Sequence, residues 1–266
     1  MASRTPDVPW ERSTAGELDA VSRARLLRAW RARIRAEHLG ISSFGVLALD
    51  LLNAGLEADV ISAVHSAALD EVRHTELCCR VATLYGAAPE RPTPGISHLP
   101  DEPNDPPVQQ ALANSILLCC VAETYAAALL DVLLATATDP VVLAVLKSIY
   151  ADEIEHSRIG WAILGHVLRT RRDEVIPMVA RAAETAFRGV SRAIDTPDMA
   201  ENATDEEISD GMRRHGLIST REARELFVTT VRDAIVPGFA GVGVDVSSAA
   251  QRYDNAWVDA THADPK

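Results

Sequence analysis

The chain has few cysteines, few aromatic residues and no recognisable strand signals. Aromatic residues make up 5% of its 266 residues, and its four cysteines form two adjacent pairs, Cys78–Cys79 and Cys119–Cys120. Neighbouring residues on a helix project in different directions, and the spacing Cys-x-x-Cys is absent. We therefore expect reduced thiols on helix faces rather than disulfides or a thiolate metal knuckle.

Positive charge and long apolar runs are also scarce. Lysine and arginine total 26 against 38 acidic residues, which gives a net charge of −12, and no basic stripe offsets it. This balance argues against a nucleic-acid footprint. No uncharged apolar run approaches the length of a membrane span, and Met1 to Leu18 lacks the apolar core of a signal peptide. We expect a cytoplasmic protein with no membrane span.

The chain does contain long stretches with helical periodicity, so the predicted fold class is all-α. After an irregular lead-in over residues 1–20, the pattern predicts helices over Val21 to Asn53, Glu57 to Tyr85, Val108 to Ala137, and Pro140 to Thr170. Short links within the first and second pairs predict two antiparallel hairpins. About twenty residues with seven prolines join the hairpins, enough to run the length of a bundle. Residues 21–170 are therefore predicted to form a four-helix bundle with one long crossover.

The chain continues well beyond this bundle. Helical patterning resumes from Asp173 to Asp195, Thr204 is predicted to cap a short helix, and Ser219–Thr220 to cap another that ends at Pro237–Gly238. We expect residues 171–238 to form accessory helices that pack on the bundle. Residues 239–266, rich in small and acidic side chains, are predicted to be a loosely ordered tail.

Two of the predicted bundle helices carry the same short pattern. Asp70-Glu71-Val72-Arg73-His74 and Asp152-Glu153-Ile154-Glu155-His156 each place an Asp-Glu pair two residues before a histidine. Positions i and i+3 share a helix face, so each segment points a carboxylate and an imidazole in the same direction. In an apolar helix such side chains are costly unless they have partners.

The other two bundle helices each offer one carboxylate at matching depth, on the apolar face. Burying four carboxylates without compensation would be prohibitive, and two divalent cations would remove that cost. A Glu-x-x-His pair from each of two helices, with a lone Glu from each of two others, is the ligand set of a dimetal site in a bundle core. Carboxylates and imidazoles suit non-haem iron or manganese, and about three protein ligands per ion leave positions open for water, dioxygen or peroxide. The predicted metal ligands are Glu37, Glu71, His74, Glu123, Glu153 and His156.

In these residues the stretch from Val21 to Thr170 resembles the ferritin-like diiron-carboxylate superfamily. That superfamily includes ferritins, rubrerythrins, the ribonucleotide reductase small subunit, acyl-carrier-protein desaturases, hydroxylases of multicomponent monooxygenases and amine N-oxygenases. The resemblance implies a ferritin-like bundle that binds two iron ions, or a mixed manganese–iron pair, through the six ligands, with Glu71 and Glu153 bridging.

The first motif is similar to the Asp-Glu-x-Arg-His segment of oxygenases and desaturases, in which the aspartate orients a ligating histidine. This implies orienting roles for Asp70 and Asp152. The second motif has Glu155 where the first has Arg73. In addition, Ile149 stands where arylamine N-oxygenases of the superfamily carry an additional histidine ligand.

Other candidate residues leave alternatives open. Tyr150 could hydrogen-bond a ligand or act in redox steps, or it could be a core tyrosine with a satisfied hydroxyl. Arg73 is predicted to form ion pairs on the outer face, with a role beside the ligands as the alternative. A layer of mostly small residues could line a substrate pocket or allow close helix packing. This layer comprises Gly40, Ile41, Ala67, Ala68, Cys119, Cys120 and Gly160.

The resemblance implies a diiron oxidoreductase of the monooxygenase type. It would use dioxygen as co-substrate to hydroxylate, desaturate or N-oxygenate a small organic substrate. No flavin, nicotinamide or iron–sulfur motif is visible, so electrons would come from a separate redox donor protein or reductant. The alternative is ferritin- or rubrerythrin-like iron oxidation or peroxide scavenging, against which the chain lacks a rubredoxin-like module and is long for a cage subunit. A helical interaction protein with a vestigial site is a third option. The substrate is not specified, and a homodimer remains open.

Overall fold

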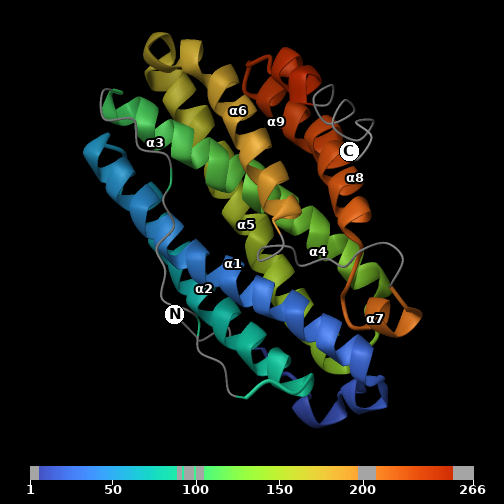
Figure 1. The fold of residues 1–266 in the computed structure, drawn as a ribbon. Coiled ribbons are helices and arrows are strands. Elements are labelled where there is room, and N and C mark those ends of the chain that lie inside the picture. The colour runs from blue at the N-terminus through green and yellow to red at the C-terminus, as the bar shows by residue number, and fades with distance from the viewer. Residues whose placement is uncertain (1–5, 89–91, 93–98, 100–104, 197–207, 254–266) are drawn as a thin grey trace.

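The computed structural model describes residues 6–88, 92, 99, 105–196 and 208–253. All the regular elements in these residues are helices, which confirms the all-α class (Figure 1). The described part of the lead-in contains only two short 3₁₀ turns, Trp10–Arg12 and Ala15–Glu17, before the first long helix begins.

The first hairpin consists of α1 (Ala20–Asn53) and α2 (Ala58–Leu84), which lie side by side along their length (Figure 1). Asp19 caps α1, because its carboxylate accepts a hydrogen bond from the Ser22 backbone N–H at 2.8 Å. The tight link after α1 depends on Gly55, whose φ of 70° is readily adopted only by glycine. The predicted antiparallel pair is therefore present with nearly the predicted bounds.

The second hairpin contains an irregularity that the sequence does not predict. In place of one regular helix, the chain forms α3 (Pro107–Ser115), a π-helical segment η3 (Ile116–Glu123) and α4 (Thr124–Thr136) in direct succession. It then turns into α5 (Pro140–Thr170), which is capped by Asp139. α1 packs against α3 and α2 against α5, so the two hairpins form one bundle. The predicted crossover between them lies largely outside the described residues.

The accessory helices cover the second hairpin. α6 (Arg172–Asp195) packs against α3 and η3, and α8 (Thr220–Thr230) packs against α4. Figure 1 shows both on the side of the α3–α4 helix that faces away from α1 and α2. Ser219 caps α8 through a full capping box with Glu222, as the sequence predicts for this residue.

One detail of this region differs from the prediction, and another is not tested. The predicted cap Thr204 lies outside the described residues, and within them the short helix α7 (Asp210–Arg214) is capped by Ser209. The predicted helix end at Pro237–Gly238 is wrong. The helix that begins with α8 continues through a second π segment, η5 (Val231–Ile235), into α9 (Val236–Gly241). Pro237 is tolerated there because it falls in the first turn of α9.

The prediction of a loosely ordered tail from residue 239 is wrong for its described part. Phe239, Val246, Ala249 and Tyr253 are buried, and residues 247–253 form a helical turn against the core. The Tyr253 ring contacts both Phe187 and Phe227. Small and acidic side chains separate these apolar residues in the sequence, so composition alone conceals that they are buried.

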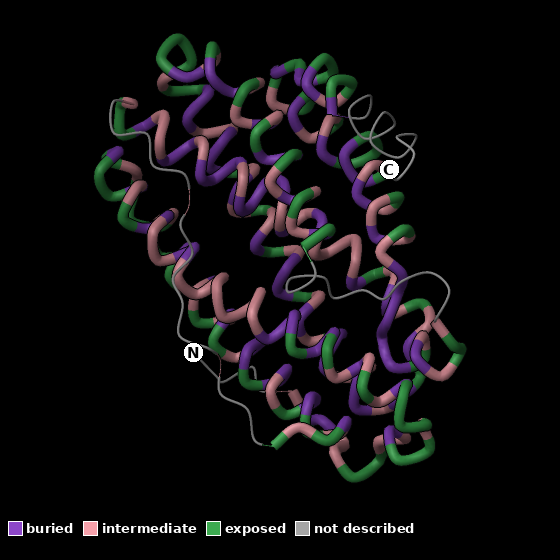
Figure 2. Tube along the Cα trace, in the orientation of Figure 1, coloured by how far each residue is buried: buried purple, intermediate pink, exposed green. Residues whose placement is uncertain are grey.

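Buried residues line the facing sides of the helices, and exposed residues follow their outer sides (Figure 2). By length and composition alone, the stretch Pro107–Thr136 could cross a membrane, although half of its most apolar part is buried within the molecule. This stretch packs against α5 and α6. Such contacts are typical of a core helix, and within the described residues it is the sole stretch of this kind.

Candidate metal centre

The structure brings all six predicted ligands together in the middle of the bundle, in two overlapping groups. In each group, one ligand atom per residue lies within 4.8 Å of the others. Glu71 and Glu153 belong to both groups, which is the position of bridging carboxylates between two ions. The first group is Glu37, Glu71, His74 and Glu153, and the second is Glu71, Glu123, Glu153 and His156.

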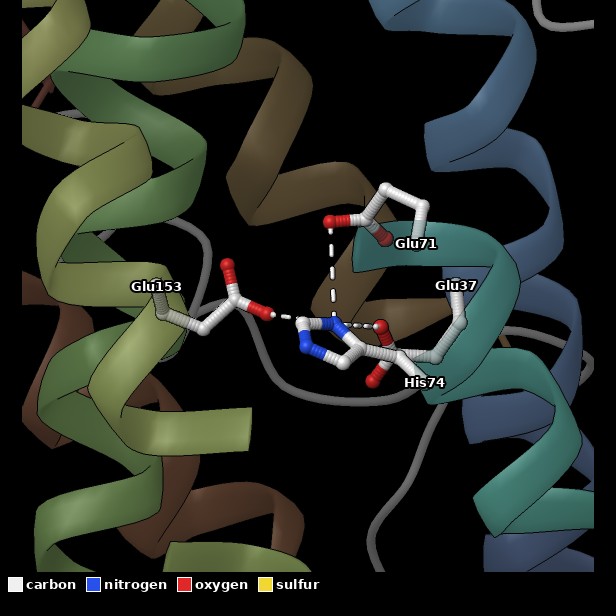
Figure 3. Close-up of side chains that lie close together, drawn as sticks. All are labelled: Glu37, Glu71, His74 and Glu153. Carbon is white, nitrogen blue, oxygen red and sulfur yellow. Dashed lines mark ion pairs between the residues drawn. The ribbon is translucent and has the colours of Figure 1, made fainter. Parts of the chain in front are cut away.

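The first group surrounds one imidazole nitrogen. Nδ1 of His74 lies 3.2 Å from Glu37 Oε2, 3.3 Å from Glu153 Oε1 and 3.7 Å from Glu71 Oε1. Figure 3 shows these carboxylates converging on the ring from α1, α2 and α5. One nitrogen thus faces three carboxylates that come from three different helices.

The second group repeats this arrangement around His156. Its Nδ1 lies 3.1 Å from Glu153 Oε2 and 3.2 Å from Glu71 Oε1. The Phe44 ring packs edge-on against the imidazole, with 5.1 Å between ring centroids. The fourth member, Glu123, is buried and completes the group from the α3–α4 side.

Local helix geometry explains how these side chains reach one another. Glu71/His74 and Glu153/His156 are i, i+3 pairs on regular helices, so each pair lies on one face. Glu123 is the last residue of the π segment, which shifts the phase of the helix at this point. π segments occur often at functional sites, but the uniformly apolar sequence around Glu123 gave no signal of one.

The outer nitrogens of the two histidines face aspartates across the hairpins. Nε2 of His74 on α2 lies 3.2 Å from Asp152 Oδ2 on α5, and Nε2 of His156 on α5 lies 3.6 Å from Asp70 Oδ2 on α2. Each aspartate therefore faces the histidine of the opposite motif. This geometry fits the orienting role expected for these two residues.

Arg73 connects the two aspartates. Its guanidinium donates to Asp70 Oδ1 at 2.7 Å and also to Asp152. The favoured prediction of an outer-face ion pair is therefore wrong, and the alternative position beside the ligands is correct. The second motif needs no arginine of its own, and Glu155 instead pairs with Arg158 on the surface.

Tyr150 does not face the metal ligands through its hydroxyl. The hydroxyl interacts with Asp131 of α4, and burial together with this carboxylate raises the tyrosine pKa. The interpretation as a packed tyrosine with a satisfied hydroxyl therefore describes it better than a role beside Glu153.

The layer of small residues serves close packing at its two glycines. A Cβ on Gly40 would lie 2.5 Å from Glu71 Oε2, so the absent side chain makes room for that carboxylate. A Cβ on Gly160 would lie 2.5 Å from the Cys119 Cβ and 2.9 Å from the Cys120 backbone nitrogen. Ala67, Cys119 and Cys120 are buried, whereas Ile41 and Ala68 are partly exposed. Of the two interpretations left open, the geometry supports packing rather than a pocket at Gly40 and Gly160.

The electrostatics show that the cluster is incomplete by itself. Burial, followed by repulsion from Glu153, raises the pKa of Glu71 to about 8. Burial lowers the pKa of His74, but the nearby carboxylates of Asp152, Glu153 and Glu37 outweigh it and raise the pKa well above its usual range. Even so, Glu71 Oε1 and His74 Nδ1 are buried without a hydrogen bond. Buried polar atoms normally have partners, so the donor set fits metal ions as its missing component.

No protein-family model matches the chain, and comparison with curated proteins gives no significant match. The class of protein is therefore defined by its fold and site alone. It is an all-α helical bundle with accessory helices and a buried carboxylate–histidine cluster that could hold metal ions, which fits a ferritin-like diiron fold.

Proposed function

We propose that this protein is a non-haem diiron oxidoreductase that activates dioxygen to oxidise a small organic substrate. The observation that carries the proposal is the pair of four-residue groups that share Glu71 and Glu153. A site with two bridging carboxylates and one inward-facing histidine nitrogen for each ion is the pattern of a dimetal centre in a helix bundle.

The residues present would divide the work between the two ions. Bound iron would supply redox chemistry with dioxygen. Glu71 and Glu153 would bridge the ions, with Glu37 and His74 completing one coordination sphere and Glu123 and His156 the other. These terminal ligands come from different helices, so the rigid bundle itself would fix the spacing between the ions.

The aspartates would prepare the histidines for this task. When Asp152 accepts the Nε2–H of His74, the lone pair of a neutral imidazole is on Nδ1, the nitrogen that faces the glutamates. Asp70 would do the same for His156. Arg73 keeps both aspartates in place and balances part of their charge.

The burial of the ligands indicates how water would be excluded and where small molecules would enter. Five of the six ligands are buried, whereas the Glu37 side chain is 12% exposed. Access therefore favours the α1 side of the centre, next to the ion that Glu37 and His74 would hold. We propose this side as the entry for dioxygen and substrate, without distinguishing hydroxylation, desaturation and N-oxygenation.

Anaerobic loading with Fe(II) tests the proposal. We expect saturation at about two ions per chain, as the two groups require. Exposure to oxygen with an added reductant and a panel of acyl, aromatic and amine compounds should then yield an oxidised product from at least one compound. Iron uptake far beyond two ions in a large assembly would instead indicate storage, and absence of tight iron binding would indicate a vestigial site.

A further inference from the structure

A second buried polar cluster lies at one end of the bundle, away from the metal centre. It joins the lead-in, the end of α2, the start of α5 and the end of α7. The Tyr85 hydroxyl lies 2.9 Å from Nδ1 of His215, and Nε2 of His215 lies 3.2 Å from Oγ1 of Thr14. The Thr14 hydroxyl in turn lies 3.1 Å from Asp139 Oδ2.

The chemistry of these hydrogen-bonded groups determines which atom carries each proton. Backbone N–H groups of Val142 and Thr14 hold the pKa of Asp139 low despite its burial, so its carboxylate only accepts hydrogen bonds. Thr14 must therefore donate its one hydroxyl proton to Asp139, and its oxygen accepts from Nε2–H of His215. Burial lowers the pKa of His215, which keeps the imidazole neutral. Its Nδ1 is thus a free lone pair that accepts the Tyr85 hydroxyl.

The cluster also reaches toward the metal centre along α1. The buried Trp30 indole interacts with the Tyr85 hydroxyl. Trp30 and Glu37 are seven residues apart, so they share one face of α1 about 10 Å apart along the helix axis. An oxidisable aromatic ring therefore lies between the metal ligands and the tyrosine–histidine pair.

We propose that Tyr85 is a redox-active tyrosine, with His215 as its proton acceptor. In the oxidation, Tyr85 gives one electron to a one-electron oxidant and becomes a neutral phenoxyl radical. Its O–H bond breaks, and the proton forms a new N–H bond at Nδ1 of His215. The imidazolium that results keeps its Nε2–H on Thr14 and lies 3.9 Å from Asp139. An electron from a reductant, with return of the proton, restores both residues.

In the working protein the oxidant would be the oxidised metal centre, so this use of Tyr85 rests on the proposed function. The tyrosine–histidine pair itself does not, because any one-electron oxidant of sufficient potential can reveal it.

Two other tyrosines have hydroxyl partners of a different kind. The Tyr125 hydroxyl donates to the backbone carbonyl of Ala223 at 3.3 Å, and a carbonyl oxygen cannot take up a proton at neutral pH. Tyr150 interacts with Asp131, a surface carboxylate. Tyr125 is as buried as a core residue, which makes it the matched control for Tyr85.

The test is photochemical oxidation of the metal-free full-length protein with ruthenium tris-bipyridine and persulfate, followed by electron paramagnetic resonance. We expect a tyrosyl radical in the wild type that is lost in Tyr85→Phe and kept in Tyr125→Phe. We also expect its formation to be slower in D₂O and its signal to be lost in His215→Gln. The experiments with ring-deuterated tyrosine and with D₂O need only the wild-type protein. The proposal can therefore still be tested if a variant fails to fold.

A signal that persists in Tyr85→Phe, or one of equal yield and lifetime in folded His215→Gln, would overturn the proposal. A second arm exposes the Fe(II)-loaded protein to oxygen. A Tyr85 radical in both arms supports the tyrosine site and its link to the metal centre. A radical in the photochemical arm alone supports the tyrosine site and counts against the proposed function.

Discussion

The molecule contains two buried polar clusters, which differ in whether their own groups supply a hydrogen-bond partner for each buried polar atom. At the metal centre, Glu71 Oε1 and His74 Nδ1 have no hydrogen bond, although charged partners surround them. At the end of the bundle, Tyr85, His215 and Thr14 form a chain in which every proton has an acceptor. A buried cluster that cannot complete its own bonds indicates a missing ion, whereas a complete one indicates architecture or proton movement.

The positions of the clusters explain this difference. The metal centre lies in the middle of long helices, where backbone groups are already paired with one another and cannot stabilise carboxylates. The second cluster lies at helix ends, where Asp139 accepts from the free N–H groups of Val141 and Val142 and from the lead-in. Helix termini supply donors that helix middles lack.

The largest expected effect is the loss of a shared carboxylate. Glu71→Ala removes a ligand from both groups, so we expect metal content after dialysis against Mn(II) or anaerobic Fe(II) to fall from about two ions per chain to nearly none. Glu37→Ala and Glu123→Ala each remove a ligand from one group, so each should retain about one ion.

Glu76→Ala serves as the matched control, because Glu76 is exposed on the same helix as Glu71. It should bind metal like the wild type. If Glu71→Ala retained as much metal as Glu37→Ala, the shared role of Glu71 would be refuted, and with it the assignment of two overlapping groups.

The second prediction concerns the polar cluster at the end of the bundle. Asp139→Ala removes the cap of α5 and the acceptor for Thr14, and we expect about 3 kcal/mol lower stability from the lost cap and the unpaired donors. Denaturant unfolding of the metal-free protein measures this loss. Metal stoichiometry should not change, whereas a loss of metal in Asp139→Ala would show that the two clusters do not act independently.

The sequence predicts the buried carboxylate–histidine cluster better than anything else in the molecule. Glu71 and His74 lie three residues apart, so helix periodicity alone places them on one face, and matched depth identifies Glu37 and Glu123. Long helices with short links likewise make the two hairpins predictable.

Features that join distant segments escape the same reasoning. Arg73 contacts Asp152 on another helix, and no local pattern marks that pair. Thr14, Tyr85 and His215 come from three separate segments, and only tertiary structure brings them together. The π segment that ends at Glu123 is hidden because a uniformly apolar helix carries no periodicity that could reveal a change of phase.

The third prediction tests whether Arg73 keeps the two aspartates in place beside the metal centre. Arg73→Leu leaves Asp70 and Asp152 without their shared partner, so both histidines lose part of their orientation. We expect metal affinity to fall by about 10- to 100-fold with stoichiometry unchanged, as measured by competition with a chelator. Glu155→Leu changes the equivalent position of the second motif, which is exposed, and should leave affinity unaltered. Equal losses in both variants would contradict a specific role of Arg73, because the two substitutions change the net charge in opposite directions.

The smallest expected effect is a change in stability with pH that comes from His215 in the cluster at the end of the bundle. Burial lowers the pKa of His215 below its ordinary value of 6.5, while the unfolded chain keeps that value. Below pH 6.5 the unfolded state therefore binds more protons, so the stability from the neutral imidazole is complete above pH 6.5 and is lost as the pH falls toward the lower folded value. The slope is at most about 1.4 kcal/mol per pH unit.

Metal-free wild type and His215→Gln should be unfolded with denaturant from roughly pH 7.5 to 5.5, around the range in which histidine titrates. The metal-centre groups are the same in both proteins and cancel in the difference. The wild type should lose stability relative to the variant as the pH falls. Parallel curves would mean that the imidazole is not held neutral, which would break the proton assignment at Nδ1 on which the Tyr85 proposal depends.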